Sequence, residues 1–200
     1  LKSLEFTTLR IKDAVCDKFR QVVDSRPYID TKNPSVRIHA YLTADSYVYY
    51  VDTSGDALYQ RGNRKASIEA PLRENLAAGI LQLSGWQVGQ PLLDPMCGSG
   101  TFLLEAAMMA LNIAPGLNRN FGFEKLKNFE SDTWKKIKNT ALKNVKPTSF
   151  QKLYGSDSDL RAVRVAKQNL EAADLLEAVQ LSHVEFTTLV PPADNGVLVA

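Results

Sequence analysis

A ten-residue run at 92–101 combines the residue types that can hold a small charged ligand. It reads Leu-Leu-Asp-Pro-Met-Cys-Gly-Ser-Gly-Thr, which is an apolar strand end, a carboxylate at Asp94 and a turn of small residues. An apolar stretch with helical period begins at Thr101. A strand–turn–helix of this kind places backbone N–H groups beside a carboxylate. It can therefore bind a ligand with an anionic end and a polar or cationic end.

The glycines of this run help to separate classes of nucleotide site. Gly98 and Gly100 allow the backbone to approach a ligand without a side-chain clash. No lysine follows Gly100, which disfavours a phosphate-binding P-loop, and position 103 is Leu, so the dinucleotide fingerprint lacks its third glycine. A G-x-G alone is a weak signal, but the small Cys97 and Ser99 and the preceding Asp-Pro pair favour a ligand site over an ordinary turn.

A second candidate group follows the next expected strand, at about residues 152–156. It reads Asp157-Ser158-Asp159, and an acidic side chain at a strand end can accept hydrogen bonds from both hydroxyls of a ribose. Asp157 fits this role better, because Asp159 is well placed to cap the following helix. An insertion explains why Asp157 lies 57 positions after Gly100, whereas about 20 is typical of dinucleotide folds.

A third candidate group, Glu185-Phe186, comes just after a strand expected at about 179–182. A carboxylate there can accept the amino group of an adenine, and the phenyl ring can lie against the base. Glutamate at a strand end is common, so the pair alone is weak evidence. Ligands of open α/β sheets bind at the carboxyl ends of the strands, so we expect the pair to join Asp94 and Asp157 in one site.

The elements that position these residues alternate between strand and helix, which is typical of a parallel sheet with helices on both faces. Strands are expected at about 91–94, 152–156, 179–182 and 196–200, and helices at about 69–84, 101–111, 131–145 and 160–170. The face of the first helix should hold Leu72, Leu76, Ile80 and Leu83. The helix at 131–145 belongs to an insertion over 114–148, with Ser131 as its cap and Trp134, Ile137 and Leu142 directed inward.

The first 52 residues have a different pattern. A helix capped by Asp13 is expected to end at Arg26-Pro27, and two strands at about 36–42 and 47–51 form a hairpin. This is too little for a full domain, so we expect its N-terminal half to be missing.

Composition narrows the function classes. The chain has 200 residues, 44% hydrophobic content and a net charge of +2, so charge alone does not indicate general polyanion binding. No run of about 18 apolar residues predicts a membrane span, and no signal peptide is evident. Cys16 and Cys97 are expected to be free thiols in a reducing cytoplasm. His39 and His183 have no cysteine partners at ligand spacing, so we expect no metal site.

The candidate motifs resemble one family of enzymes. Asp-Pro-Met-Cys-Gly-Ser-Gly-Thr at 94–101 and Gly-Ser-Asp-Ser-Asp at 155–159 are similar to motifs of the Rossmann-like S-adenosylmethionine-dependent methyltransferases. The chain most resembles the THUMP-containing bacterial 23S rRNA guanine-N2 methyltransferase family, whose members are often labelled N6-adenine-specific DNA methylases. In this resemblance 1–52 is the C-terminal half of a THUMP-like RNA-binding domain, 53–68 a linker, and 69–200 the N-terminal part of a Rossmann-like methyltransferase domain.

The resemblance implies a cofactor contact for each candidate residue. Asp94 and the turn at 97–101 would face the amino-acid end of S-adenosylmethionine, and Asp157 would bind its ribose. Glu185 stands where the family usually has Asp, and with Phe186 it would contact the adenine. The expected cofactor-binding residues are Asp94, Met96, Cys97, Gly98, Ser99, Gly100, Thr101, Asp157, Ser158, Asp159, Glu185 and Phe186.

The resemblance also predicts what residues 1–200 do not contain. The family places Asn-Pro-Pro-Tyr directly after a strand that resembles Val197-Leu198-Val199-Ala200, so the catalytic motif is expected beyond Ala200. The intact protein is then expected to methylate N2 of a guanine in ribosomal RNA, whereas this fragment alone is inactive. It is expected to be cytoplasmic and to need neither membrane nor metal.

Three alternatives stay open at this point. One is N6-adenine methylation of DNA, which the THUMP-like segment disfavours because such modules recognise RNA shape. Another is a nicotinamide-dependent oxidoreductase, which the missing third glycine opposes. The last is an RNA-binding module without catalysis. The oligomeric state is not predicted.

Overall fold

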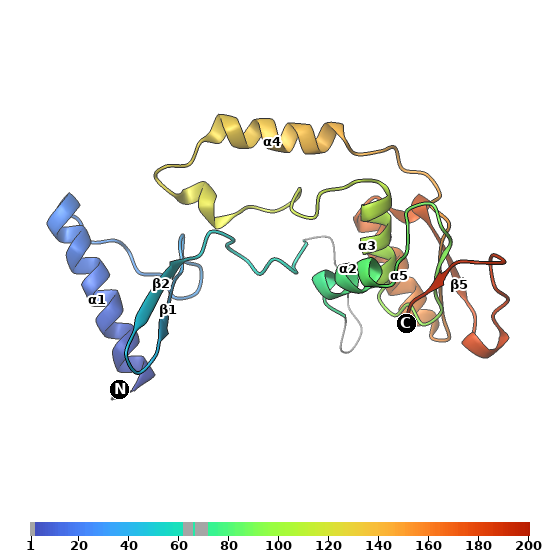
Figure 1. Ribbon diagram of the computed structural model, residues 1–200, viewed down its shortest axis with the longest axis horizontal. Coiled ribbons are helices and arrows are strands. Elements are labelled where there is room, and N and C mark those ends of the chain that lie inside the picture. The colour runs from blue at the N-terminus through green and yellow to red at the C-terminus, as the bar shows by residue number, and fades with distance from the viewer. Residues whose placement is uncertain (1–2, 62–65, 67–71) are drawn as a thin grey trace. The chain divides into compact units, whose positions relative to one another are not determined.

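The computed structural model describes residues 3–61, 66 and 72–200, and it divides into two compact units (Figure 1). Unit 1 is Leu1–Val51 and unit 2 is Asp52–Ala200. Residue 69 and part of the expected linker at 53–68 lie outside the described residues. The helix expected from about 69 begins only at Glu74, because residues 72–73 are not helical. The domain boundaries expected from the sequence stay a prediction.

Unit 1 begins with a helix that is longer than the sequence pattern predicts. Helix α1 spans Leu4–Val23, and the side chain of Ser3 caps it by accepting a hydrogen bond from the Phe6 N–H at 3.0 Å. The expected cap, Asp13, is wrong, because this residue lies in mid-helix with its carboxylate 2.9 Å from Lys12 Nζ. The hydroxyl of Ser3 satisfies a first-turn N–H that has no partner within the helix.

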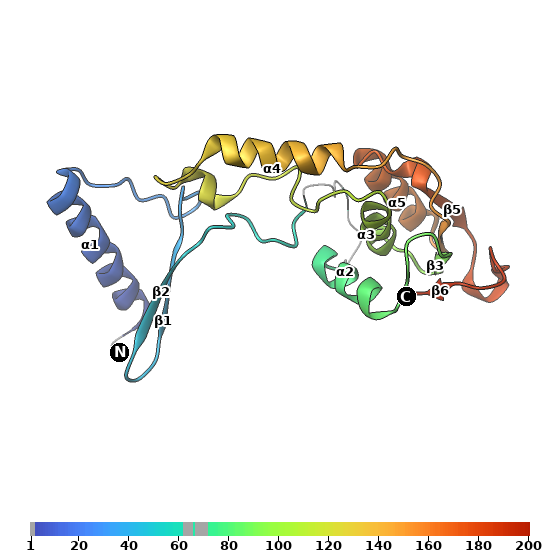
Figure 2. The same cartoon turned by 45° about the horizontal axis from the view of Figure 1, so that its top comes forward.

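The rest of unit 1 is the predicted antiparallel hairpin (Figure 2). Strands β1, Ile38–Leu42, and β2, Tyr47–Val51, pair with Ile38 opposite Val51. Side chains of both strands are exposed along nearly their whole length. Among the described residues of unit 1, Cys16 alone is buried, so this unit has little core of its own.

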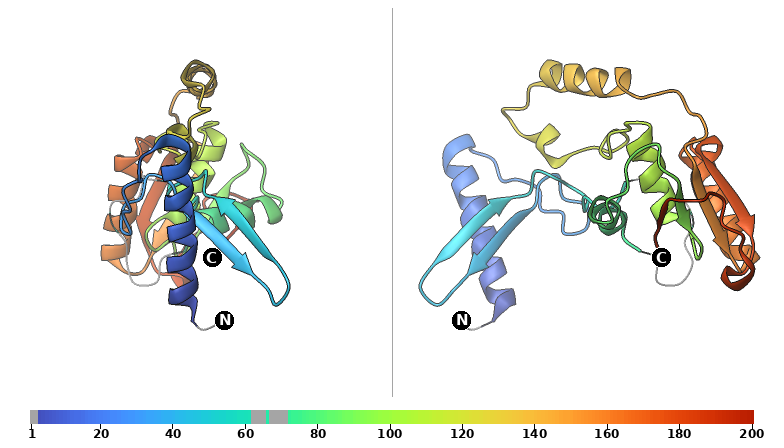
Figure 3. Two further views of the ribbon diagram at one scale, coloured as in Figure 1. Left: turned by 90° about the vertical axis from the view of Figure 1, so that its left-hand side faces the viewer. Right: turned by 45° about the vertical axis from the view of Figure 1, so that its right-hand side comes forward.

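Unit 2 is built on the predicted parallel sheet (Figure 3). Its strands, in the spatial order β5-β4-β3-β6, are β5 Val179–His183, β4 Leu153–Asp157, β3 Leu92–Asp94 and β6 Val197–Leu198. All three neighbouring pairs are parallel. Strand β6 is shorter than expected. Strand β4 extends two residues beyond the end of β3, because Asp94, the last residue of β3, is opposite Gly155 and β4 ends at Asp157.

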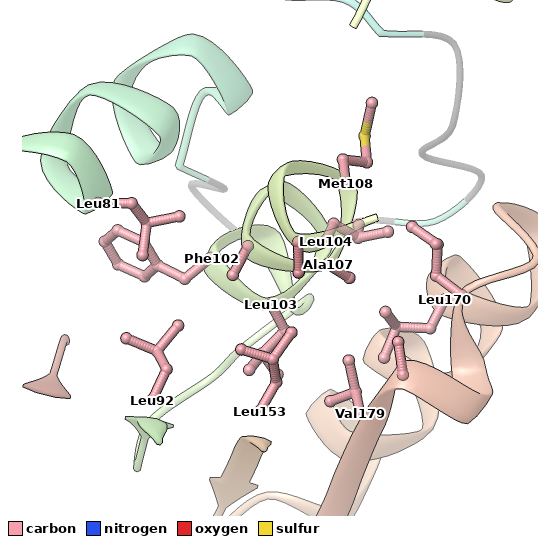
Figure 4. Packing of buried hydrophobic residues seen from close by; sticks show 14 of the residues in the cluster. Leu81, Leu92, Phe102, Leu103, Leu104, Ala107, Met108, Leu153, Leu170 and Val179 are labelled. Atoms are coloured by element: carbon pink, nitrogen blue, oxygen red, sulfur yellow. The ribbon is translucent and has the colours of Figure 1, made fainter. Parts of the chain in front are cut away.

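The helices of unit 2 are α2 Glu74–Leu83, α3 Thr101–Ala110, α4 Ser131–Lys143 and α5 Leu160–Ala172. Helices α3 and α5 both contact β4 and each other, so they share one face of the sheet. Figure 4 shows Leu103 of α3 pointing toward Leu153 of β4, and Phe102 beside Leu81 of α2. These side chains belong to the hydrophobic core.

Helix α2 buries only part of the face expected for it: Leu72, just before the helix, and Ile80 pack against the core. Ala77 and Leu81 are fully buried, whereas Leu83 is 89% exposed and Leu76 is 51% exposed. The packing of α2 against α3 selects the helix face. The sequence alone does not predict which face is buried, because apolar residues lie along two faces of this helix.

The insertion forms α4, but its cap and inward face differ from the prediction. Glu130, not Ser131, is the N-cap residue, and its carboxylate accepts a hydrogen bond from the Thr133 hydroxyl at 2.9 Å. Ile137 and Leu142 are each 54% exposed, and no residue of this helix is buried. Of the three residues expected to point inward, Trp134 is the one that packs against neighbouring aromatic rings.

Candidate functional site

The candidate site lies where β3 and β4 end, and hydrogen bonds join the two strand ends. The Cys97 N–H donates to the Ser156 carbonyl at 2.8 Å, and the Gly98 N–H donates to Asp157 Oδ2 at 2.9 Å. The glycine turn and Asp157, which are separated by an insertion in the sequence, are therefore in contact. The register of the parallel pair brings them together.

The turn needs glycine at two positions. Gly98 and Gly100 have φ values of 52° and 80°, in the left-handed region that other residues rarely adopt. The Gly100 N–H donates to the Cys97 carbonyl at 2.7 Å and closes the turn. A Cβ at Gly100 would also lie 3.1 Å from the Cβ of Ala166 on α5. The glycine thus lets α5 approach the turn, and α3 begins at the next residue, Thr101.

A buried amide, which the sequence interpretation missed, holds this turn from behind. Asn169 of α5 is fully buried and donates from Nδ2 to the carbonyls of Ser99 and Ala66, each at 3.0 Å. Its Oδ1 accepts from the Ala66 N–H, also at 3.0 Å. The signal in the sequence is a polar residue on an apolar helix face, three positions after Ala166 and next to Leu170.

Asp94 is a buried carboxyl group beside a second carboxyl group. It is 2% exposed, and its Oδ1 accepts a hydrogen bond from the Met96 N–H at 3.3 Å. Burial raises the pKa of Asp94 to about 7, the Met96 N–H opposes this rise, and the charge of Asp157 adds to it. A cationic ligand would favour the ionised form of this group.

Cys97 shares this environment but not the chemistry of a nucleophile. Burial, together with the charges of Asp94 and Asp157, raises the pKa of its thiol to about 12. The thiolate is the reactive form of cysteine, so this side chain is unreactive at neutral pH.

A pocket of about 310 Å³ opens at the turn. Its lining is Leu72, Ile80, Asp94, Met96, Cys97, Gly98, Ser99, Thr101, Phe102 and Ala200. Six of these belong to the predicted site, whereas Leu72, Ile80, Phe102 and Ala200 do not. Leu72 and Ile80 belong to the apolar face that the sequence pattern predicts, and they both pack against the core and line the pocket, so the hydrophobic pattern alone does not distinguish a pocket wall from the core. The pocket combines an acidic, glycine-lined side with an apolar wall.

Both oxygens of the Asp157 carboxylate accept backbone hydrogen bonds. Oδ2 takes the Gly98 N–H and Oδ1 takes the Asp159 N–H, each at 2.9 Å. Asp159 caps α5 as expected, accepting from the Arg161 N–H at 2.8 Å. His183 was not predicted here, yet its Nε2 lies 2.9 Å from the Ser158 carbonyl. Hydrogen bonds therefore connect the segment at 157–159 to the turn after β3, to α5 and to β5.

Glu185 and Phe186 stand after β5 but outside this pocket. Glu185 precedes a short 3-10 helix, Phe186–Thr188, and the Phe186 side chain is 54% exposed. The Val184 N–H donates to the Asp157 carbonyl at 3.2 Å, which links the segment to β4. Their role as adenine contacts stays a prediction.

The described residues contain neither a candidate metal-ion site nor a membrane-spanning helix. Within the described ranges, no group of three or more His, Cys, Asp or Glu side chains is arranged to hold a metal ion. In the same part of the chain, no helix has both the length and the apolar character needed to cross a bilayer.

Comparison with known proteins decides the family. Residues 61–200 match the RMKL-like methyltransferase domain family, and residues 1–52 match the THUMP domain family. The chain belongs to the RMKL-like methyltransferase family. The resemblance inferred from the motifs is thus confirmed, as is the Rossmann-like methyltransferase fold behind a THUMP segment.

Individual relatives agree with this assignment. Ribosomal RNA large subunit methyltransferase K/L of Psychromonas ingrahamii is 42% identical over 205 residues, which cover all of this chain and 27% of the relative. SMU.472, a proposed methyltransferase solved in complex with SAH, is 35% identical with a TM-score of 0.82, over 94% of this chain and 49% of that one. A predicted N6-adenine-specific DNA methylase from Listeria monocytogenes is 28% identical with a TM-score of 0.81, over 94% and 50%. This RMKL-like chain therefore spans under a third of the curated relative.

Proposed function

We propose that the full-length protein transfers a methyl group from S-adenosylmethionine to N2 of a guanine in 23S ribosomal RNA. In this proposal residues 1–200 supply part of an RNA-binding domain and the cofactor-binding part of the enzyme. The observation that carries it is the turn at 97–100, which is hydrogen-bonded to Asp157 and lines one pocket with the buried Asp94. A relative named as a large-subunit rRNA methyltransferase supports the substrate, and a cytoplasmic location is part of the same proposal.

The residues present fit a cationic nucleoside ligand. Asp94 lines the pocket and Asp157 accepts a hydrogen bond from Gly98 of its lining, so the site is electronegative; among the described residues, no Lys or Arg lines it. Each oxygen of Asp157 accepts one backbone N–H, and a carboxylate has about four lone-pair positions in total, so capacity remains for two ribose hydroxyls. Asp94, with Met96, would hold the amino-acid end.

The division of labour follows from the chemistry of an exocyclic amine. When bound, S-adenosylmethionine supplies an electrophilic methyl group on a sulfonium. This chain's residues hold the ligand and exclude water from it, and positioning is a large part of catalysis for such direct transfers. The sequence Asn-Pro-Pro-Tyr, which the family uses on the substrate amine, does not occur in residues 1–200. We expect these residues to bind the cofactor without transferring methyl groups.

Ligand binding by residues 1–200 tests the cofactor part of this proposal. S-adenosylhomocysteine at 100 times its Kd should stabilise the chain by about 2.7 kcal/mol, seen as a higher melting temperature. Asp157→Ala should abolish the rise in melting temperature. Asp174→Asn, which changes an exposed carboxylate two residues after the end of α5, should preserve it. A shift with NAD but not with S-adenosylhomocysteine would instead indicate the oxidoreductase.

Substrate choice needs the full-length protein. Methyl transfer from labelled S-adenosylmethionine should reach 23S rRNA and be lost when N2 of the target guanine is absent, as in inosine. The Listeria relative, named for DNA adenine, favours the alternative substrate. Label on duplex DNA, with none on RNA, would establish that alternative. Binding of RNA without any transfer would indicate the non-catalytic module.

A further inference from the structure

The insertion at 114–148 has a charge opposite to that of the sequence around it. It contains eight Lys or Arg and three Asp or Glu. The flanking stretches 66–113 and 149–200 together contain five Lys or Arg and eleven Asp or Glu. Exposed lysines lie on both its loop and its helix, namely Lys125, Lys127, Lys135, Lys136 and Lys143. A polyanion would therefore be attracted to the insertion rather than to the acidic stretches that flank it in the sequence.

Aromatic rings gather at the same place. The Trp134 ring packs edge-on against Phe123 and Phe121, with centroids 5.0 and 5.6 Å apart, and Phe129 lies 6.0 Å from Phe123. Each of these four rings is only half-buried. Lys138 Nζ lies 5.1 Å from the centre of the Trp134 ring.

A groove of about 400 Å³ lies along this cluster. Phe123, Phe129, Trp134 and Ile137 contribute to its lining, which also includes Glu130. Its volume is within the range of small-ligand sites. The Trp134 indole N–H is buried without an acceptor among the described residues, whereas a cluster serving only as a local core would be expected to satisfy this donor.

Hydrogen bonds hold the segment that carries the aromatic rings in place. The Arg119 guanidinium donates to the carbonyls of Ser54 and Ala57, each at 3.2 Å, and also to that of Asp56. The Phe123 N–H donates to the Thr53 carbonyl at 2.9 Å. These bonds attach the aromatic end of the insertion to the start of unit 2, so a ligand would meet ordered rings.

We propose that this groove binds an unpaired base of the RNA substrate, with the surrounding lysines contacting its phosphates. Single-stranded nucleic acids are bound by this combination of aromatic rings and positive charge. A second copy of the chain is a poorer occupant, because it would bring two lysine-rich surfaces together. The inference rests on the proposed action on RNA, and it adds a recognition site separate from the cofactor pocket and from residues 1–52.

Charge-reversed variants of the whole 200-residue chain test the phosphate contacts. The probe is a 12-nucleotide oligouridine RNA, followed by fluorescence anisotropy at several salt concentrations. Lys136→Glu with Lys143→Glu should weaken binding at least tenfold and lower the salt slope by about 1.4. Arg164→Glu with Lys167→Glu, which changes the same charge on exposed positions of α5, should alter affinity by less than threefold.

Tryptophan fluorescence tests separately whether Trp134 stacks on a base. Trp86 is buried, so quenching of tryptophan fluorescence by the RNA should report on Trp134. Trp134→Ala should weaken binding roughly 5- to 150-fold, the equivalent of one base stack, and Trp134→Phe should retain most of the affinity. A blunt RNA duplex of the same length should give little quenching.

Three outcomes would overturn the inference. These are equal effects of the two charge-reversed pairs, no quenching by oligouridine, and a concentration-dependent dimer in sedimentation that Trp134→Phe abolishes. Melting curves confirm that each variant folds. S-adenosylhomocysteine binding should be unchanged in all of them, so a failure here is separable from a failure of the cofactor proposal.

Discussion

Asp94 places an ionisable group where ionisation is costly. Its burial and the neighbouring Asp157 raise its pKa to about 7 in the native state, from an ordinary value of 3.8. Between these values the native chain holds a proton that the unfolded chain has lost. The native state is therefore stabilised by Asp94 below about pH 4, and this contribution disappears as the pH rises through 7.

Asp94→Asn should reveal this titration. The amide cannot ionise, so the variant should gain stability relative to the natural chain as the pH rises from 4 to 8. The total difference is on the order of 4 kcal/mol, from about 1.4 kcal/mol for each pKa unit. Urea unfolding at several pH values measures it. Asp174→Asn, at an exposed carboxyl group, should show no comparable pH dependence; a matching dependence would contradict the assignment to Asp94.

Gly100 is required both for its left-handed backbone and for the close approach of Ala166, and Gly85 serves as a control that separates the two effects. Gly85 has a similar φ, 77° against 80°, but a Cβ there would meet nothing within 4 Å. Gly85→Ala should therefore cost only the left-handed backbone, about 1–2 kcal/mol. Gly100→Ala should cost about 1–3 kcal/mol more, because the new Cβ presses on Ala166. Thermal unfolding compares the two, and equal losses would show that α5 yields to the added methyl group.

At the scale of elements, α5 acts as a support for the β3–α3 turn. Asn169→Ala removes the amide that donates to Ser99 and that pairs with both backbone groups of Ala66. We expect a loss of about 2–4 kcal/mol, since buried backbone groups lose partners, together with weaker S-adenosylhomocysteine binding. Gln168→Ala, at the exposed neighbouring position, should leave both nearly unchanged. Full retention of ligand affinity in Asn169→Ala would show that the turn holds itself.

The same element shows what sequence can and cannot predict. The order of strands and helices, the glycine turn and the Asp159 cap follow from local spacing, so they were predictable. Asn169 and the pocket wall at Leu72 and Ile80 depend on which segments meet in three dimensions. The face that α2 buries is set by its packing against α3, and Ile137 of α4 is exposed although the sequence pattern directs it inward.

At the scale of the whole molecule, the two units differ in how much they bury. The hydrophobic core cluster consists of residues of unit 2, from Ala77 to Val199. Among the described residues of unit 1, Cys16 is the one buried side chain. A hairpin of two strands is at best marginally stable in water. The chain is therefore not expected to unfold as one cooperative block.

Hydrogen exchange should resolve this difference along the chain. Amides of β1 and β2 should exchange at least 100 times faster than those of β3 and β4, about 3 kcal/mol in opening free energy, because local stability follows buried contacts. Adding S-adenosylhomocysteine should slow exchange at the turn after β3 and at 157–159, and leave the hairpin unchanged, because the candidate site lies in unit 2. The comparison within one sample removes differences in solvent and concentration. Equal protection of both units would show that unit 1 has a stabilising partner, and ligand protection spreading into the hairpin would show that the two units fold as one.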